Sequence, residues 1–237
     1  METASLKLSL ISKGKDPKGR ILTILCVSVF PVRARRDSSM TVDGYDTTSV
    51  ALRNKGIKEI PVEFCYYFKH IVCVNLSRNL IPSLPSDIGG MSNLKILDLS
   101  RNQLTSLPPE IGKLKQLSEL DVSQNQLVSL PEELWDLLNL QVLVLSDNNI
   151  STLSEHIGNL SSLRELRLSY NMLTTIPGEL GKLQNLETLS LNNNKINAVP
   201  EKLADLPKEV DLYLSDNRIE TSEVPRVFME KFGDSLY

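Results

Sequence analysis

Cysteine, histidine and long apolar runs are all scarce in this sequence. Its three cysteines, Cys26, Cys65 and Cys73, form neither a Cys-x-x-Cys pair nor an even-numbered cluster, so a reducing compartment, the cytoplasm, is favoured. The two histidines, His70 and His156, have no cysteine or serine partner at a recognisable spacing. We therefore expect no metal site, no cofactor and no catalytic set. A stretch of about 18 apolar residues, the length that crosses a membrane as a helix, does not occur.

Charge is unevenly distributed along the chain. Residues 1–36 carry eight basic and two acidic side chains, a net charge of +6. Residues 37–237 carry 18 basic and 27 acidic side chains, a net charge of −9. Binding to nucleic acid depends on Lys and Arg that neutralise phosphates, so the acidic main part of the chain argues against a nucleic-acid partner.

Asparagine recurs every 23 residues through most of the chain. The seven positions are Asn79, Asn102, Asn125, Asn148, Asn171, Asn194 and Asn217. Apolar residues keep step with them, as Leu97, Leu99, Leu104 and Leu107 do around Asn102. This LxxLxLxxNxLxxL spacing is typical of leucine-rich repeats, each of which forms one coil of a solenoid.

The pattern predicts an α/β fold, a curved leucine-rich-repeat solenoid. Each LxL segment should form a short strand with both leucines turned inward, and stacking should place these strands in a parallel β-sheet on the concave face. The Asn has one acceptor and two donors, which can satisfy backbone groups of its own coil and of the next one. We therefore predict a structural role for the Asn ladder.

The return path of each coil is regular as well, as in LPPEIGKLKQL and LPEELWDLLNL. Pro suits the start of a helical turn, and an acidic residue near it suits the helix dipole. Apolar residues at every third position fit short helical or 3₁₀ turns on the convex face. Trp135 stands where most of the repeats have Gly, and we favour its packing against a neighbouring coil over a contact with a partner.

Three regions follow from this repeat. Residues 1–44 lack it and form a basic leader that we expect to be poorly ordered. Residues 45–220 are the repeat domain, an N-terminal cap coil with Lys55 in place of Asn and then seven 23-residue repeats. Residues 221–237 are expected to form a C-terminal capping helix, because terminal repeats must shield the core.

Aromatic and apolar residues mark both ends of the repeat domain. In the first coil Phe64, Tyr66, Tyr67 and Phe68 are expected to cover the open end of the core. At the other end, near-helical spacing joins Val224, Val227, Phe228 and Phe232.

The leader contains a twelve-residue apolar run, ILTILCVSVFPV. A signal peptide would explain the run, but no small-x-small cleavage site follows it. A mitochondrial presequence fits the Arg and Ser content better, and an anchor at a membrane surface is a third possibility. We prefer none of these to a poorly ordered leader, and Met40 could be the true start of translation.

A protein partner would contact the outward positions of the concave strands. The residue before each Asn runs from basic to acidic along the array, and the residue four before it adds further side chains. Arg and Tyr dominate interface energies, and a pair of valines offers an apolar centre. The candidate partner-binding residues are Arg78, Arg101, Val142, Val144, Arg167, Tyr170 and Tyr213. For any one of them, a solvated strand residue is an equally good interpretation.

Other polar groups carry less weight. Asp98 and Asp121 could face each other on adjacent strands, but paired carboxylates on an open face usually form a solvated patch, so we expect no enzyme. Sequons at Asn75, Asn149 and Asn159 arise from the repeat itself.

The form of the repeat narrows the class. SLPSDIGGMSNL, SLPPEIGKLKQL and TIPGELGKLQNL follow an LPxxIGxLxxL pattern over about residues 50 to 220. This pattern resembles that of the intracellular Ras-group leucine-rich-repeat proteins, which include the Ras suppressor protein, Scribble-type scaffolds and their plant relatives. The resemblance implies a non-enzymatic scaffold, often in small-GTPase signalling.

We therefore expect a cytoplasmic, monomeric adaptor or scaffold. Its concave face should bind a protein, such as a small GTPase or its regulator, without nucleic acid and without firm membrane contact. The alternative is a peripheral membrane or organelle-targeted interaction protein directed by the leader. An enzyme and a secreted, glycosylated receptor fragment are further alternatives.

Overall fold

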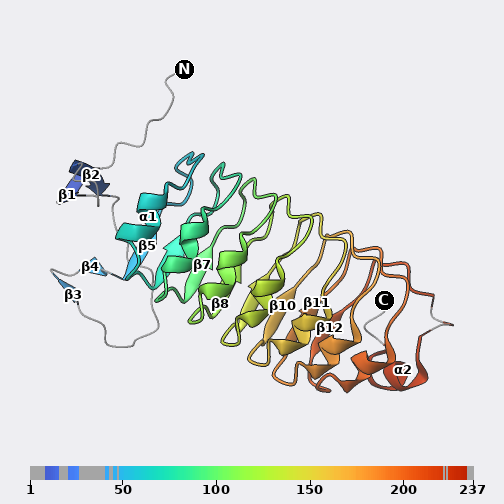
Figure 1. The fold of residues 1–237 in the computed structure, drawn as a ribbon. Helices are drawn as coiled ribbons and strands as arrows, with labels where there is room; N and C mark the ends of the chain where they lie inside the picture. The colour runs from blue at the N-terminus through green and yellow to red at the C-terminus, as the bar shows by residue number, and fades with distance from the viewer. Residues whose placement is uncertain are drawn as a thin grey trace.

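The main body of the protein is a solenoid of stacked coils (Figure 1). A computed structural model of the chain describes residues 9–15, 21–26, 41–42, 45–46, 48–220, 222 and 224–233. One strand from each coil joins an eight-stranded parallel sheet, in the order β12-β11-β10-β9-β8-β7-β6-β5. Strands that are neighbours in the sequence are therefore neighbours in the sheet, which confirms the predicted solenoid.

The strands are three residues long. Their bounds are β5 Ser49–Ala51, β6 Cys73–Asn75, β7 Ile96–Asp98, β8 Glu119–Asp121, β9 Val142–Val144, β10 Glu165–Arg167, β11 Thr188–Ser190 and β12 Asp211–Tyr213. The central residue of each is buried, and each pairing joins residues 23 or 24 positions apart, as Leu97 pairs with Leu120. A constant repeat length of 23 residues thus sets the register from β6 to β12, and the β5–β6 pairing has an interval of 24.

The opposite face consists of one helix and six 3₁₀ turns, as predicted. They are α1 Val62–Tyr67, η1 Ser86–Gly90, η2 Pro109–Lys113, η3 Glu132–Asp136, η4 Glu155–Asn159, η5 Gly178–Lys182 and η6 Glu201–Asp205. Pro occupies the position before most of these turns, where Pro108 has φ −70° and ψ 146°. The fixed φ of proline suits this extended entry to the turn.

The Asn ladder connects consecutive coils. Asn125 Nδ2 donates to Val122 O of its own coil and to Leu99 O of the preceding coil, both over 3.0 Å. Its Oδ1 accepts from Leu104 N, also in the preceding coil, over 2.9 Å. The predicted bonds are present, but the expectation that they reach the next coil was wrong. The backbone just after the Asn runs against the preceding coil, because Gln126 N donates to Leu104 O.

A left-handed turn takes the chain out of each strand. The residue before each Asn or its equivalent has a φ between 54° and 58° in Asn54, Arg78, Arg101, Gln124, Asp147, Tyr170, Asn193 and Asp216. This conformation costs a non-glycine residue roughly 1–2 kcal/mol. A backbone bond to the next coil, such as Gln124 N to Ser146 O over 2.9 Å, supports it.

Trp135 is buried in the convex layer and is only 1% exposed. In the neighbouring coil a Cβ on Gly112 would lie 2.3 Å from Glu133 O, so the coils are closely stacked at this position. The turn η3, which carries Trp135, packs less closely against η4 than the other 3₁₀ turns pack against their neighbours. The interpretation of Trp135 as a packing residue is confirmed.

In the first coil α1 takes the place of a 3₁₀ turn and packs against η1. Phe64 and Phe68 are partly buried against the core, whereas Tyr66 is 55% exposed, so only part of the aromatic run covers the core. Cys65 is buried, and burial together with the charge of Asp87 raises the pKa of its thiol to about 11. Cys65 therefore acts as a small apolar side chain.

The last coil is covered by α2, Arg226–Phe232. Phe228 and Phe232 are buried, and Lys231 Nζ donates to Ala204 O over 2.9 Å. Val227, which also fitted the helical spacing, is exposed.

The described residues before β5 form two short antiparallel pairs, the second of which crosses the predicted limit of the leader at residue 44. They are β1 Ser9–Lys15 with β2 Ile21–Cys26, and β3 Thr41–Val42 with β4 Tyr45–Asp46. The rest of the leader, residues 27–40 included, lies outside the described residues, so its predicted lack of order and the domain limits stay predictions. No helix in the described part of the chain has the length and apolar character for a membrane crossing.

Candidate functional site

The outward residues of the parallel strands form one open face, here called the concave face. They flank each buried strand centre in two columns. From β6 to β12, the first column is Cys73, Ile96, Glu119, Val142, Glu165, Thr188 and Asp211, and the second is Asn75, Asp98, Asp121, Val144, Arg167, Ser190 and Tyr213. With strands ~4.8 Å apart, the six steps from β6 to β12 span roughly 29 Å.

A row of turns borders this face where the chain leaves the strands, and we call it the strand-exit rim. It consists of the left-handed residues, the residues directly before them and the residues directly after the Asn positions. Arg78, Arg101 and Tyr170 lie on this rim, three residues past the strand ends, and not on the strands to which the sequence analysis assigned them. The strands are too short to include them.

Exposed aromatic and valine side chains lie on the C-terminal half of the face and its rim, while Leu80, 41% exposed, is an apolar rim residue of the N-terminal half. Val142 and Val144 flank buried Leu143 on β9 and are partly exposed. Tyr170 is 56% exposed and Met172, on the same turn, is 41% exposed. Tyr and Met are among the residue types enriched where proteins bind proteins.

Tyr213 lies apart from that group. It is 51% exposed on β12, the last strand of the sheet, three steps or roughly 14 Å from Val144. Arg167 on β10 is not a free cation, because its Nε lies 2.5 Å from Oε1 of Glu165. The structure thus brings Val142, Val144 and Arg167 together on β9 and β10, places Tyr170 on the rim past β10, and leaves Arg78, Arg101 and Tyr213 towards the two ends.

The paired carboxylates on the face stabilise turns. Asp98 and Asp121 are partners in register, and Asp98 Oδ2 accepts a hydrogen bond from Asn75 Nδ2 over 2.8 Å. Asp121 Oδ1 accepts from the backbone N and the hydroxyl of Ser123, over 2.9 and 2.6 Å. Burial raises the pKa of Asp121, and the bonds from Ser123 oppose that rise. The two carboxylates therefore accept hydrogen bonds from neighbouring residues of the face and its turns, and both remain partly exposed to solvent.

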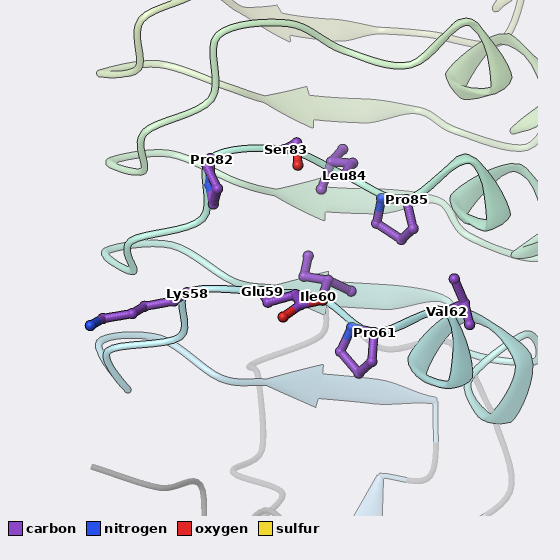
Figure 2. A pocket seen from close by; sticks show the side chains of 9 residues that line it. All are labelled: Lys58, Glu59, Ile60, Pro61, Val62, Pro82, Ser83, Leu84 and Pro85. Carbon is purple, nitrogen blue, oxygen red and sulfur yellow. The ribbon is translucent and has the colours of Figure 1, made fainter. Parts of the chain in front are cut away.

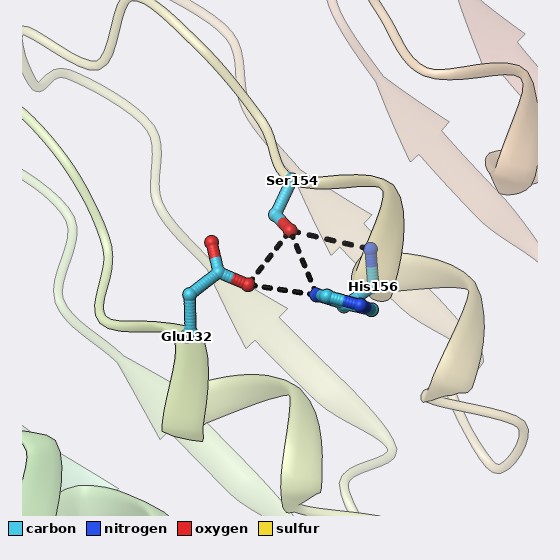
Figure 3. A network of polar contacts seen from close by, with 3 residues as sticks. All are labelled: Glu132, Ser154 and His156. Atoms are coloured by element: carbon cyan, nitrogen blue, oxygen red, sulfur yellow. Dashed lines mark hydrogen bonds and ion pairs between the residues drawn. The ribbon is translucent and has the colours of Figure 1, made fainter.

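One cluster resembles catalytic chemistry and lies on the convex face (Figure 3). Glu132 Oε2 lies 2.8 Å from Ser154 Oγ and 2.9 Å from His156 Nδ1, and the hydrogen bonds from His156 and Ser154 lower the pKa of Glu132. Both Ser154 and Glu132 contact the same ring nitrogen of His156, whereas a nucleophile, base and orienting acid need both nitrogens. Glu132 and His156 are exposed and Ser154 is partly exposed, and their bonds join η3 to η4.

A shallow pocket lies near the N-terminal end, away from the concave strands (Figure 2). Its volume is about 240 Å³, between the first two coils. It is lined by Lys58, Glu59, Ile60, Pro61, Val62, Pro82, Ser83, Leu84 and Pro85. Among the described residues, no three or more His, Cys, Asp or Glu side chains are grouped as metal ligands.

Sequence reasoning missed two residues of this surface. Met172 directly follows Asn171, at the position where the repeat of Asn125 has the polar residue Gln126. An apolar residue at this outward position could have indicated a contact surface. Arg53 lies on the rim beside Arg78, but it precedes Arg78 by 25 residues and so falls outside the 23-residue column.

The architecture is that of a repeat solenoid with an open, preformed face. The chain belongs to the leucine-rich-repeat family, whose profile, described as "Leucine rich repeat", matches residues 69–127, 92–150, 115–173, 139–184 and 161–219. Leucine-rich-repeat proteins generally mediate protein–protein interaction. No curated protein sequence gives a match to the chain.

Solved structures of repeat proteins are similar to this chain. A leucine-rich-repeat protein of Leptospira interrogans is 30% identical over 81% of this chain, with a TM-score of 0.70, and the match spans about half, 53%, of that protein. Internalin C2 from Listeria monocytogenes is 29% identical, with 75% of this chain and 74% of that one covered and a TM-score of 0.66. The plant peptide hormone receptor RGFR1, in complex with RGF2, is 28% identical over 68% of this chain and 30% of the receptor, with a TM-score of 0.62.

Proposed function

We propose that this protein is a non-enzymatic adaptor or scaffold that binds a protein partner on its concave face. The observation that carries the proposal is the exposure of Tyr213 on the concave face and of Tyr170 and Met172 on its rim, where the backbone is hydrogen-bonded from coil to coil. A preformed face loses little conformational entropy on binding, and large aromatic side chains supply most of the contact energy.

Affinity capture from cytosolic extract tests the proposal. The full chain is compared with a Tyr170→Ala, Met172→Ala, Tyr213→Ala variant, and captured proteins are identified by mass spectrometry. The control variant is Val128→Ala, Leu138→Ala, since both residues are exposed to a similar degree but lie outside the concave face and its rim. We expect proteins that are retained by the control and lost from the triple variant. Identical captures from all three, with circular dichroism showing intact folds, would contradict the proposal.

The proposal also includes a pathway, a compartment and an oligomeric state, namely small-GTPase signalling, the cytoplasm and a monomer. The resemblance of the LPxxIGxLxxL repeats to the Ras-group proteins supports a small GTPase or its regulator as the partner, and the scarcity of cysteine supports the cytoplasm. A small GTPase or regulator among the proteins lost from the triple variant is the expected result, and its absence would remove this assignment. Light scattering should give the mass of a monomer, 26.5 kDa.

The second candidate is targeting by the leader. Its support is the net charge of +6 on residues 1–36 around a twelve-residue apolar run, a combination that favours membrane surfaces and organelle import. Deletion of residues 1–36 should redistribute the protein in cells if the leader directs it. An unchanged distribution by fluorescence imaging would exclude this candidate.

A further inference from the structure

A row of arginines borders the N-terminal half of the concave face. Arg78 and Arg101 occupy the same left-handed position in consecutive coils, with φ 57° and 56°. Arg53 directly precedes Asn54, which holds that position in the first coil with φ 55°. All three arginine side chains are exposed.

Backbone hydrogen bonds hold these turns against one another. Asn54 N donates to Ser77 O over 3.0 Å, and Arg78 N donates to Ser100 O over 2.9 Å. The turns therefore follow the ~4.8 Å spacing of the strands. The charge of Arg101, and then that of Arg53, lowers the pKa of Arg78, as expected of like charges held close together. Within the described part of the chain, no ion pair neutralises any of the three.

The charge changes sign within the same face. Glu119 and Asp121 lie on β8, two strands from the β6 coil that carries Arg78, and Asp98 lies between them on β7. Asp121 uses only Oδ1 for the hydrogen bonds from Ser123, and no hydrogen bond to a described residue engages the carboxylate of Glu119. Arg78, in the middle of the arginine row, thus lies two strand steps or about 10 Å across the sheet from this acidic strip, and Arg101 lies one step from it.

We propose that the concave face binds a protein segment of mixed charge, with an acidic group over Arg53, Arg78 and Arg101 and a basic group over Glu119 and Asp121. This inference rests on the proposed function and names the chemistry of the partner. A uniformly anionic surface, such as an acidic membrane or a nucleic acid, would place its charge against Glu119 and Asp121 as well, and like charges brought together at an interface oppose binding.

Peptides of defined charge test the inference. From Arg78, the middle of the row, two strand steps are ~10 Å and an extended chain covers ~3.3 Å per residue, so about three neutral residues should separate the two charged blocks. The probes are a fluorescein-labelled peptide with a Glu block and a Lys block, an all-Glu peptide of equal length and a neutral Gln peptide. They are titrated with the full chain and followed by fluorescence anisotropy at low salt.

We expect the mixed-charge peptide to bind about tenfold more tightly than either other peptide and to lose that advantage with the Arg78→Glu, Arg101→Glu variant. The control is Arg218→Glu, since Arg218 is an exposed rim arginine in the last repeat. Equal binding of the three peptides, the absence of binding included, overturns the inference. Tighter binding to phosphatidylserine vesicles than to the mixed-charge peptide also overturns it. If the double variant loses its circular dichroism spectrum, Arg78→Gln, Arg101→Gln replaces it.

The capture experiment separates this inference from the proposed function. In one outcome, proteins are captured by the Arg78→Glu, Arg101→Glu variant and not by the Tyr170→Ala, Met172→Ala, Tyr213→Ala variant. That result would overturn the mixed-charge inference and leave the proposed function standing. If neither variant loses a protein, the proposed function itself fails.

Discussion

The side-chain amide of Asn125 lies 3.0 Å from the carbonyl oxygen of Leu99, which belongs to the preceding coil. The same amide group also serves Val122 O, and its oxygen serves Leu104 N. One buried side chain therefore satisfies three backbone groups that no water can reach. Six further asparagines repeat this arrangement, so the ladder is a part of the core.

Asn125→Leu should lower the free energy of unfolding by about 1–3 kcal/mol, because it leaves these buried backbone groups without partners. Urea unfolding followed by circular dichroism measures the change. Gln126→Ala is the matched control, since Gln126 is exposed and its backbone bond does not depend on its side chain. Equal midpoints for the two variants would contradict the structural role of the ladder.

Trp135→Ala should lower the free energy of unfolding more, by about 3–5 kcal/mol, because it removes a large side chain that is 1% exposed on η3. Before mutation, the fluorescence of this single Trp should be blue-shifted and resist quenching by acrylamide. Leu138→Ala removes a nearby exposed side chain and should change stability by less than about 0.5 kcal/mol. Ready quenching of the native protein would show that the indole is not packed as described.

Gly112→Ala should destabilise the protein by about 1–3 kcal/mol, because the new Cβ would lie 2.3 Å from the backbone oxygen of Glu133. Gly90→Ala is the control, with no atom within 4 Å of its Cβ position. Because alanine is the better helix former, this control should be neutral or slightly stabilising. Thermal unfolding of both variants makes the comparison, and similar losses would argue against close stacking at Gly112.

Asp121→Asn should stabilise the protein at neutral pH. Burial raises the pKa of Asp121 above its ordinary value of 3.8, so the charged form opposes folding at pH 7, and this opposition is lost as the pH falls through the raised pKa towards 3.8. The difference between variant and wild type should therefore shrink on acidification. Asparagine can keep the turn, since Asn75 Oδ1 accepts from Ser77 N over 3.0 Å in the same way.

The urea midpoint at several pH values measures this effect. The control is Asp211→Asn on β12, where the carboxylate is exposed. A variant that is less stable than wild type at pH 7 would show that the hydrogen bonds to the charged form outweigh the burial of Asp121.

The repeat spacing alone predicted the coils, the parallel sheet and the convex turns. The pattern from Leu97 to Leu107 around Asn102 predicts these elements because each coil needs the same inward residues at the same intervals to bury its core. The packing of Trp135 was also predicted, since a large apolar side chain in the place of Gly lies next to a neighbouring coil. The position of Arg78 on the rim was not predicted from the sequence. The three-residue strand ends before Arg78, and the left-handed turn then directs its side chain.

The sequence by itself determined the period, the register of the sheet and the identity of the buried residues, because these depend on spacing within one repeat. Tertiary structure decided that Asn125 bonds to the preceding coil and that Arg53 lies beside Arg78 despite an interval of 25 residues. It also placed Glu119 and Asp121 two strands from Arg78 and one strand from Arg101. These relationships join different coils, and stacking in three dimensions is what sets the contacts between one coil and the next.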